Sequence, residues 1–278
     1  MLLALGPHRH DVTHRSLVMG ILNRTPDSFY DRGRYWGFDD FLAKAEQLVA
    51  DGADFLDVGG VKAGPGEVVT EAMELDRVVP AVEALVERFD LPVSVDTWRA
   101  SVAEACFAVG AVVGNDISGF ADPRYVEVCA SAGASVVATH IRLAPRVADP
   151  NPVYDDVVTD VSAFLADRAG QAMAAGIPRE RIMVDAGLDL GKNEQQSLDL
   201  LRASDQLVSL GYPVFLSASN KRFIGELLGT DVADRTSGTN AAHALGIALG
   251  CRILRAHDAR AARRVADTMA AISEARAA

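Results

Sequence analysis

Eight short apolar stretches of this chain each end in polar side chains whose types could form a binding site. Carboxylates, amides and basic groups are costly inside a buried strand unless they are paired or used. Taken alone, one such residue is explained as the cap of the following helix or as a satisfied structural group. Because the pattern recurs at the same end of all eight stretches, a shared binding site is the better interpretation. The residues are Asn23, Asp57, Asp96, Asn115, Asp116, His140, Asp185, Ser217, Ser219, Lys221, Arg255 and His257.

Three of these residues suit a flat nitrogen heterocycle. Asp96, Asn115 and Asp185 supply two carboxylates and an amide at the ends of nearby stretches. Carboxylates accept hydrogen bonds from guanidine-like N–H groups, and an amide both donates and accepts. We therefore expect these side chains to hold the polar edge of a base-like ring.

Three others suit an anion. Arg255 and His257 close the last stretch, and Asn23 closes the first. An arginine fork matches phosphate oxygens, and an amide oxygen can share a magnesium ion with a diphosphate. The chain has no H-E-x-x-H motif and no cysteine cluster, which argues against a protein-bound zinc.

The elements that must position these residues alternate between strand and helix. Apolar, β-branched stretches alternate with segments of helical spacing, such as residues 38–53, which Gly52 ends, and residues 259–278. Roughly eight such units predict an α/β fold, a single (β/α)8 TIM barrel in one domain over residues 1–278, with an N-terminal extension at 1–15. A doubly wound open sheet is the alternative, but no G-x-G-x-x-G follows the first stretch. The stretches begin at Leu17, Phe55, Pro92, Val112, Ser135, Arg181, Pro213 and Arg252.

Composition excludes several classes of protein. A net charge of -11 and a pI near 5.0 argue against a general nucleic-acid binder, which needs a basic face. The first residues are too briefly apolar for a signal peptide or membrane span, so no membrane partner is expected. Cys106, Cys129 and Cys251 are far apart in apolar surroundings and are interpreted as core thiols of a cytoplasmic protein.

Several motifs in order resemble those of the dihydropteroate synthase family of pterin-binding barrels, from about Leu17 to the final helix. They are MGILNRTPDSFYDRG, SVDTWRA, NDISG, VDAGLDLGK, SNKRFIG and RAHD. The chain is similar to divergent second-copy paralogues of actinobacteria, some of them inactive. The reaction implied joins a hydroxymethyl-dihydropterin diphosphate to para-aminobenzoate and releases diphosphate, with Mg²⁺ stabilising the leaving group.

The resemblance also implies roles for the residues that match these motifs. Asp96, Asp185 and Lys221 are implied to be catalytic and, with Asn115, to bind the pterin. The residues implied to hold the diphosphate are Asn23, Arg255 and His257, with Asn23 also the magnesium ligand.

The chain departs from the family in the loop that follows the second strand. The family usually has D-I-G-G-E-S-T-R-P-G, whereas this chain has DVGGVKAGPG, with Ala63 in place of threonine and Gly64 in place of arginine. Losing one charge-assisted contact there costs on the order of 1.5 to 3 kcal/mol, about 10- to 100-fold in affinity or rate. Lys62 and Arg24 are candidates to replace the lost diphosphate contact, or else are solvated loop charges. Further departures are Thr139, Asp189, Leu190, Asn220 and Arg222.

Three functions fit these observations: a working synthase, a paralogue that binds pterins with weak or no synthase activity, and a pterin-dependent methyltransferase. The Asn23 loop and the motifs around Lys221 and Arg255 fit the methyltransferases less well. Expected partners are small molecules, namely the pterin diphosphate and para-aminobenzoate or another amine, and a second copy in a homodimer. The small, apolar last helix could form such an interface or pack on the core.

Overall fold

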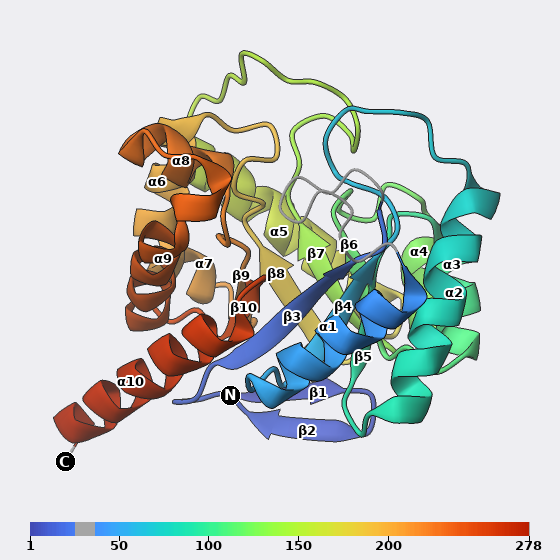
Figure 1. Cartoon of the computed structure of the whole chain (residues 1–278). Helices are drawn as coiled ribbons and strands as arrows, with labels where there is room; N and C mark the ends of the chain where they lie inside the picture. The colour runs from blue at the N-terminus through green and yellow to red at the C-terminus, as the bar shows by residue number, and fades with distance from the viewer. Residues whose placement is uncertain (26–36, 278) are drawn as a thin grey trace.

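The computed structural model describes residues 1–25 and 37–277, and its centre is a closed barrel of eight parallel strands (Figure 1). All eight predicted stretches form barrel strands, and the last strand pairs with the first, with Ile253 opposite Leu17. The strands are almost wholly buried, as expected for parallel strands covered by helices. They are β3 (Leu17–Asn23), β4 (Phe55–Gly59), β5 (Val93–Asp96), β6 (Val113–Asp116), β7 (Ser135–Thr139), β8 (Ile182–Asp185), β9 (Val214–Leu216) and β10 (Ile253–Ala256).

Helices surround the barrel and bury one face each against it (Figure 1). In the first helix Phe41, Ala45 and Leu48 are fully buried, at the spacing that puts side chains on one face. Gly52 follows that helix with a φ of +91°, so the predicted stop is confirmed. The helices are α1 (Phe38–Ala50), α2 (Glu71–Arg88), α3 (Ala100–Ala108), α4 (Tyr125–Ser131), α5 (Val157–Ala174), α6 (Glu194–Arg202), α7 (Ser204–Val208), α8 (Arg222–Leu228), α9 (Thr236–Ala248) and α10 (Ala259–Ala277), with short 3₁₀ turns at Arg179–Arg181 and Val232–Asp234.

A hairpin before the barrel closes its lower end. β1 (Leu2–Leu5) and β2 (His8–Asp11) pair in an antiparallel manner beneath the barrel (Figure 1). Leu3 and Leu5 are fully buried in a cluster with the residues that begin the barrel strands, such as Phe55. The Ser135 hydroxyl donates a hydrogen bond to the Ala4 carbonyl at 2.5 Å. One end of the barrel is thus filled, which leaves the opposite end for a ligand.

The described part of the chain has no helix that is long and apolar enough to cross a membrane. The first predicted motif extends past Asn23 to Gly33, and its residues 26–33 lie outside the described residues. The rest of the predicted strand-end residues can be placed.

Candidate functional site

A cavity of about 480 Å³ opens at the carboxyl ends of the barrel strands. Its size is that of a small-molecule site. The structure brings nearly all of the predicted binding residues into this one cavity. The predicted residues among its lining are Asn23, Lys62, Asp96, Asn115, Asp185, Ser217, Ser219, Lys221, Arg255 and His257.

Arg255 lies at the base of the cavity between two carboxylates. Its Nε donates to Asp57 Oδ2 at 2.7 Å, and its Nη2 donates to Asp96 Oδ2 at 2.8 Å. The side chains of Arg255 and Asp96 are about one-sixth exposed, at 16% and 15%, whereas Asp57 is fully buried. The predicted anion-binding arginine is therefore already paired with acids, one of which is a predicted ring-binding residue.

Asp57 connects these groups, and we call Asp57, Ser94, Asp96, Asn115 and Arg255 the base network. Ser94 Oγ donates to Asp57 Oδ1 at 2.7 Å, and Asn115 Nδ2 donates to Asp57 Oδ2 at 3.2 Å. Sheet register explains the contacts, because Asp57 is opposite Ser94 and Asp96 is opposite Asn115. Sequence reasoning placed Asp57 among the strand-end residues of the shared site but gave it no individual role. The sequence feature that could have indicated its role is a carboxylate within an apolar strand, paired with a serine on the following strand.

Burial raises the pKa of Asp96 to about 7. The neighbouring Asp57 carboxylate adds to this rise, while Arg255 opposes it, because two acids share one cation. Asp96 can therefore carry a proton near neutral pH, so that its carboxyl group can donate as well as accept a hydrogen bond. A ring edge that presents both kinds of group suits such a residue.

Asp185 and Lys221 are oppositely charged residues that line the same cavity. Asp185 Oδ1 accepts a hydrogen bond from the Gly187 amide at 2.8 Å, and Lys221 Nζ donates to the Leu188 carbonyl at 2.5 Å. Burial raises the pKa of Asp185 and lowers that of Lys221, and the attraction between the two opposes both shifts. This pair adds an acceptor and a donor to those of the base network.

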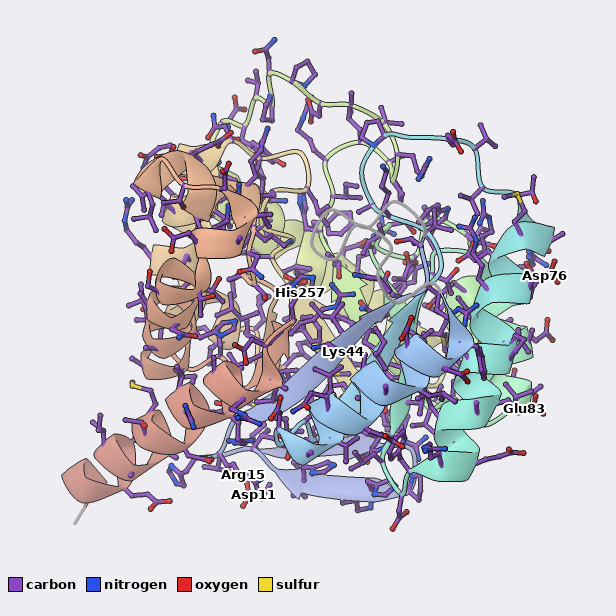
Figure 2. All side chains as sticks on the ribbon, in the orientation of Figure 1. Asp11, Arg15, Lys44, Asp76, Glu83 and His257 are labelled. Carbon is purple, nitrogen blue, oxygen red and sulfur yellow. The ribbon has the colours of Figure 1, made fainter. Side chains whose placement is uncertain are left out.

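His257 is held as a neutral side chain. Its Nδ1 lies 3.0 Å from Ser219 Oγ, and Lys44 Nζ donates to its carbonyl oxygen at 3.4 Å. Figure 2 shows Lys44 reaching toward His257 from α1. Burial lowers the pKa of His257 to about 3, and the positive charges of Arg255, Lys44 and Lys221 add to this effect. At neutral pH the imidazole can offer an anion a hydrogen bond but no positive charge.

Two predicted strand-end residues serve the scaffold instead of the cavity. Asp116 accepts hydrogen bonds from the amides of Ser118 and Phe120 at 2.6 and 2.9 Å, which shapes the loop after β6. His140 Nδ1 lies 2.8 Å from Nζ of the buried Lys192. Neither Asp116 nor His140 lines the cavity. Adjacent strand residues point to opposite faces, so Asn115 faces the cavity and Asp116 does not.

The altered loop forms part of the cavity rim, and we call residues 62–67 the rim loop. Lys62, Ala63 and Gly64 line the cavity. Arg146, from the loop after β7, holds the rim loop: its amide donates to the Ala63 carbonyl at 2.8 Å, and its guanidinium donates to the carbonyls of Lys62 and Glu67.

Arg24 is not brought into the cavity lining. Its guanidinium lies over the rings of Phe38 and Phe41, 5.2 and 5.4 Å from their centroids. Of the two candidate replacement cations, the structure brings only Lys62 to the cavity.

The cavity offers few ligands to a resident metal ion. Among residues 1–25 and 37–277 there is no group of three or more His, Cys, Asp or Glu side chains that could hold one. Asp57 and Asp96 are paired with Arg255, and the amide oxygen of Asn23 is a further oxygen that lines the cavity. Mg²⁺ commonly keeps water and substrate phosphate oxygens around one or two protein oxygens. The residues therefore fit a magnesium ion that arrives with a phosphorylated ligand.

Comparison with known proteins identifies relatives across the chain. Residues 19–257 match the family described as "Pterin binding enzyme". A Mycobacterium leprae protein named inactive dihydropteroate synthase 2 is 46% identical over 93% of this chain and 91% of its own length. The dihydropteroate synthase of Bacillus subtilis is 38% identical over 93% and 89%.

Solved structures agree with these relatives. The dihydropteroate synthase of Yersinia pestis, solved with a sulfonamide drug complex, superimposes with a TM-score of 0.94 at 35% identity, over 99% of this chain and all of that one. That of Thermus thermophilus, in complex with 4-aminobenzoate, superimposes with a TM-score of 0.86 at 38% identity, over 98% and 100%.

Proposed function

The chain belongs to the pterin-binding enzyme family, as a member of the dihydropteroate synthases, and we propose that it binds a hydroxymethyl-dihydropterin diphosphate at the barrel mouth. The proposed reaction transfers the pterin methylene group to an amine and releases diphosphate. The convergence of Asp96, Asn115, Asp185 and Lys221 on one cavity carries this proposal. Dihydropteroate synthases are transferases of folate biosynthesis, and the fold and motif order of this chain agree with theirs.

The proposed pterin contacts follow from the chemistry of the cavity. Asp185 and Asp96 accept from the guanidine-like edge of the ring, and Asn115 pairs with an adjacent donor and acceptor. Lys221 donates to a ring oxygen or nitrogen. These contacts orient the exocyclic carbon toward the rim, where the amine enters.

In the proposed reaction the bond between the exocyclic carbon and the diphosphate oxygen breaks as the amine nitrogen forms a new bond to that carbon. Positive charge spreads into the pterin, and the Asp185 carboxylate stabilises it, together with Asp96 in its ionised form. The amine then loses a proton to solvent. His257 donates a hydrogen bond to the leaving diphosphate, and Asn23 would hold a magnesium ion on it. A bound magnesium ion would neutralise charge on the leaving group.

A second candidate function is a paralogue that binds pterins but is a weak or inactive synthase. Ala63 and Gly64 line the cavity where the family usually has a threonine and an arginine. A relative at 46% identity is named inactive. Both observations point to the diphosphate and amine side, whereas the residues proposed to bind the pterin are present.

Calorimetric titration separates the two candidates. The full chain is titrated with 6-hydroxymethylpterin and with the dihydropterin diphosphate, each with and without magnesium, and product formation with para-aminobenzoate is followed in parallel. A working synthase binds the diphosphate more tightly in magnesium and forms product. A degraded paralogue binds both pterins about equally and forms little product. Absence of affinity for either pterin would refute both candidates.

We also propose that the chain forms a homodimer in the cytoplasm. Leu227 and Leu228 on α8 and Leu245 on α9 are exposed large apolar side chains, which a second copy would cover. The three cysteines are free and buried, a state that a reducing compartment preserves. Sedimentation at micromolar concentration tests the dimer, and a monomeric mass would contradict it.

A further inference from the structure

Asp189 lies on the cavity wall in a backbone conformation that most side chains avoid. Its φ is +67°, in the left-handed region that glycine adopts freely. The dihydropteroate synthase motif D-P-G-I-G-F-G-K has glycine at the position of Asp189, whereas residues 185–192 of this chain read DAGLDLGK. An aspartate held there requires an interaction that offsets the strain.

The side chain of Asp189 makes that interaction with the start of α8. Its Oδ2 accepts a hydrogen bond from the Arg222 amide at 2.5 Å, and its Oδ1 accepts one from the Phe223 amide at 3.3 Å. Its own amide donates to Ser197 Oγ at 3.2 Å. A carboxylate anchored through its backbone and both oxygens is a fixed negative charge, unlike an acid on a free loop.

The same wall carries the cations that would otherwise attract an acidic substrate. Lys221, Arg222 and Arg235 line the cavity together with Asp189. Arg235 Nη1 donates to the carbonyls of Asn220 and Lys221 at 2.9 and 3.2 Å, so part of its donor capacity is used within the protein. The Asp189 carboxylate weakens the field of these cations and occupies two backbone N–H donors at the start of α8.

We propose that Asp189 sets the specificity for the amine substrate by disfavouring an amine that carries a carboxylate. The inference rests on the proposed function, because it concerns the second substrate of the same cavity. Leu190 and Val61 add apolar surface to the lining. The preferred nucleophile is accordingly an arylamine with a neutral polar group in place of the carboxylate.

A pair of ligands and a matched pair of variants test this proposal. The full chain, saturated with 6-hydroxymethylpterin, magnesium and inorganic diphosphate, is titrated with 4-aminobenzoate and with its neutral counterpart 4-aminobenzamide. Asp189→Asn removes the charge and keeps the shape, and Asp189→Gly also removes the backbone strain. Asp156→Asn is the control, because Asp156 caps α5 through the Thr159 amide at 2.8 Å and does not line the cavity.

The wild-type chain is expected to bind the amide at least as tightly as the benzoate. In both Asp189 variants the ratio of the two dissociation constants is expected to move toward the benzoate by about tenfold or more, because like charges no longer face each other. Asp156→Asn leaves the ratio unchanged. A ratio that stays within twofold in Asp189→Asn and Asp189→Gly overturns the proposal, as does failure of all variants to bind either amine. Titration with the pterin alone tests the proposed function separately, so the two failures are distinguishable.

Discussion

The base and the rim of the cavity hold their functional groups in different ways. In the base network Asp57, Ser94, Asp96 and Asn115 stand on adjacent strands, in register, and are joined by buried hydrogen bonds around Arg255. On the rim, residues 62–67 belong to a loop that is tied mainly through backbone carbonyls to Arg146. The base is held through its side chains, whereas the rim loop is held to Arg146 through its backbone.

This difference agrees with the departure of the rim loop from the family pattern. A change in the base network leaves a buried charge or donor without a partner, which is costly. Ala63 and Gly64 of the rim loop carry no polar side chain, so a change at either position breaks no side-chain hydrogen bond. The rim loop can therefore have Ala63 and Gly64 in place of the family's threonine and arginine while the base network stays intact.

The largest effect should come from removing the centre of the base network. Asp57→Ala leaves Arg255, Ser94 and Asn115 short of a buried acceptor, so the free energy of unfolding should fall by about 3 to 5 kcal/mol. Denaturant unfolding measures it. The control is Asp199→Ala, which breaks an exposed ion pair with Arg202 and should change stability by about 1 kcal/mol or less. Equal losses in the two variants would mean that the base is no more constrained than the surface.

The converse experiment restores the family's threonine and arginine in the rim loop. Ala63→Thr with Gly64→Arg should raise the rate of product formation about 10- to 100-fold, since a charge-assisted contact is regained. Room exists for the new side chain, because a Cβ at Gly64 would meet no atom of the described residues within 4 Å. Val68→Arg adds the same charge at a residue that is 84% exposed, and should have no effect. If activity does not rise, the loop is not the cause of any impairment.

The pH dependence of stability tests whether the cavity holds His257 as a neutral side chain. The pKa of His257 is about 3 in the folded protein and 6.5 as a free side chain, so the unfolded chain binds the extra proton first. The free energy of unfolding is therefore unaffected by His257 above about pH 6.5. As the pH falls from 6.5 toward 3, protonation of His257 in the unfolded chain lowers it by about 1.4 kcal/mol per pH unit. His257→Gln should therefore lose about 2 kcal/mol less than the wild type between pH 6.5 and 5.

Exposed His14 supplies the control for that measurement. His14→Gln keeps His257, so its curve of unfolding free energy against pH should still show the loss below pH 6.5 that His257 causes. Parallel curves for His257→Gln and the wild type would show that His257 is not held neutral.

The smallest effect is expected where the rim loop is tied. Arg146→Gly fits the local φ of +69° and removes the guanidinium bonds to Lys62 and Glu67. Stability should change by about 1 kcal/mol or less, while amide hydrogen exchange in residues 62–67 should speed up. Arg124→Ala, in a distant exposed ion pair with Asp122, should leave that exchange unchanged. Unchanged exchange in Arg146→Gly would contradict the role of Arg146.

Much of the site was predictable because its signals are local. The apolar stretches and the polar residues that end them predicted the eight barrel strands, and barrel topology then predicted that Asp96, Asn115 and Asp185 would meet. The resemblance located the altered loop without any coordinates. The role of Asp57 was missed, because its partners come from strands 37 to 198 residues away in sequence.

The sequence by itself determined the strands, the helices and the chemical types of the side chains at the barrel mouth, since these follow from periodicity and composition. Only the tertiary structure decided which of them face the cavity. Asn115 and Asp116 are neighbours on one strand, yet one contacts the base network and the other its own loop. Arg24 lies over aromatic rings, and Arg255 pairs with acids. Such choices depend on side-chain direction and on long-range pairing, which are set when the strands come into register.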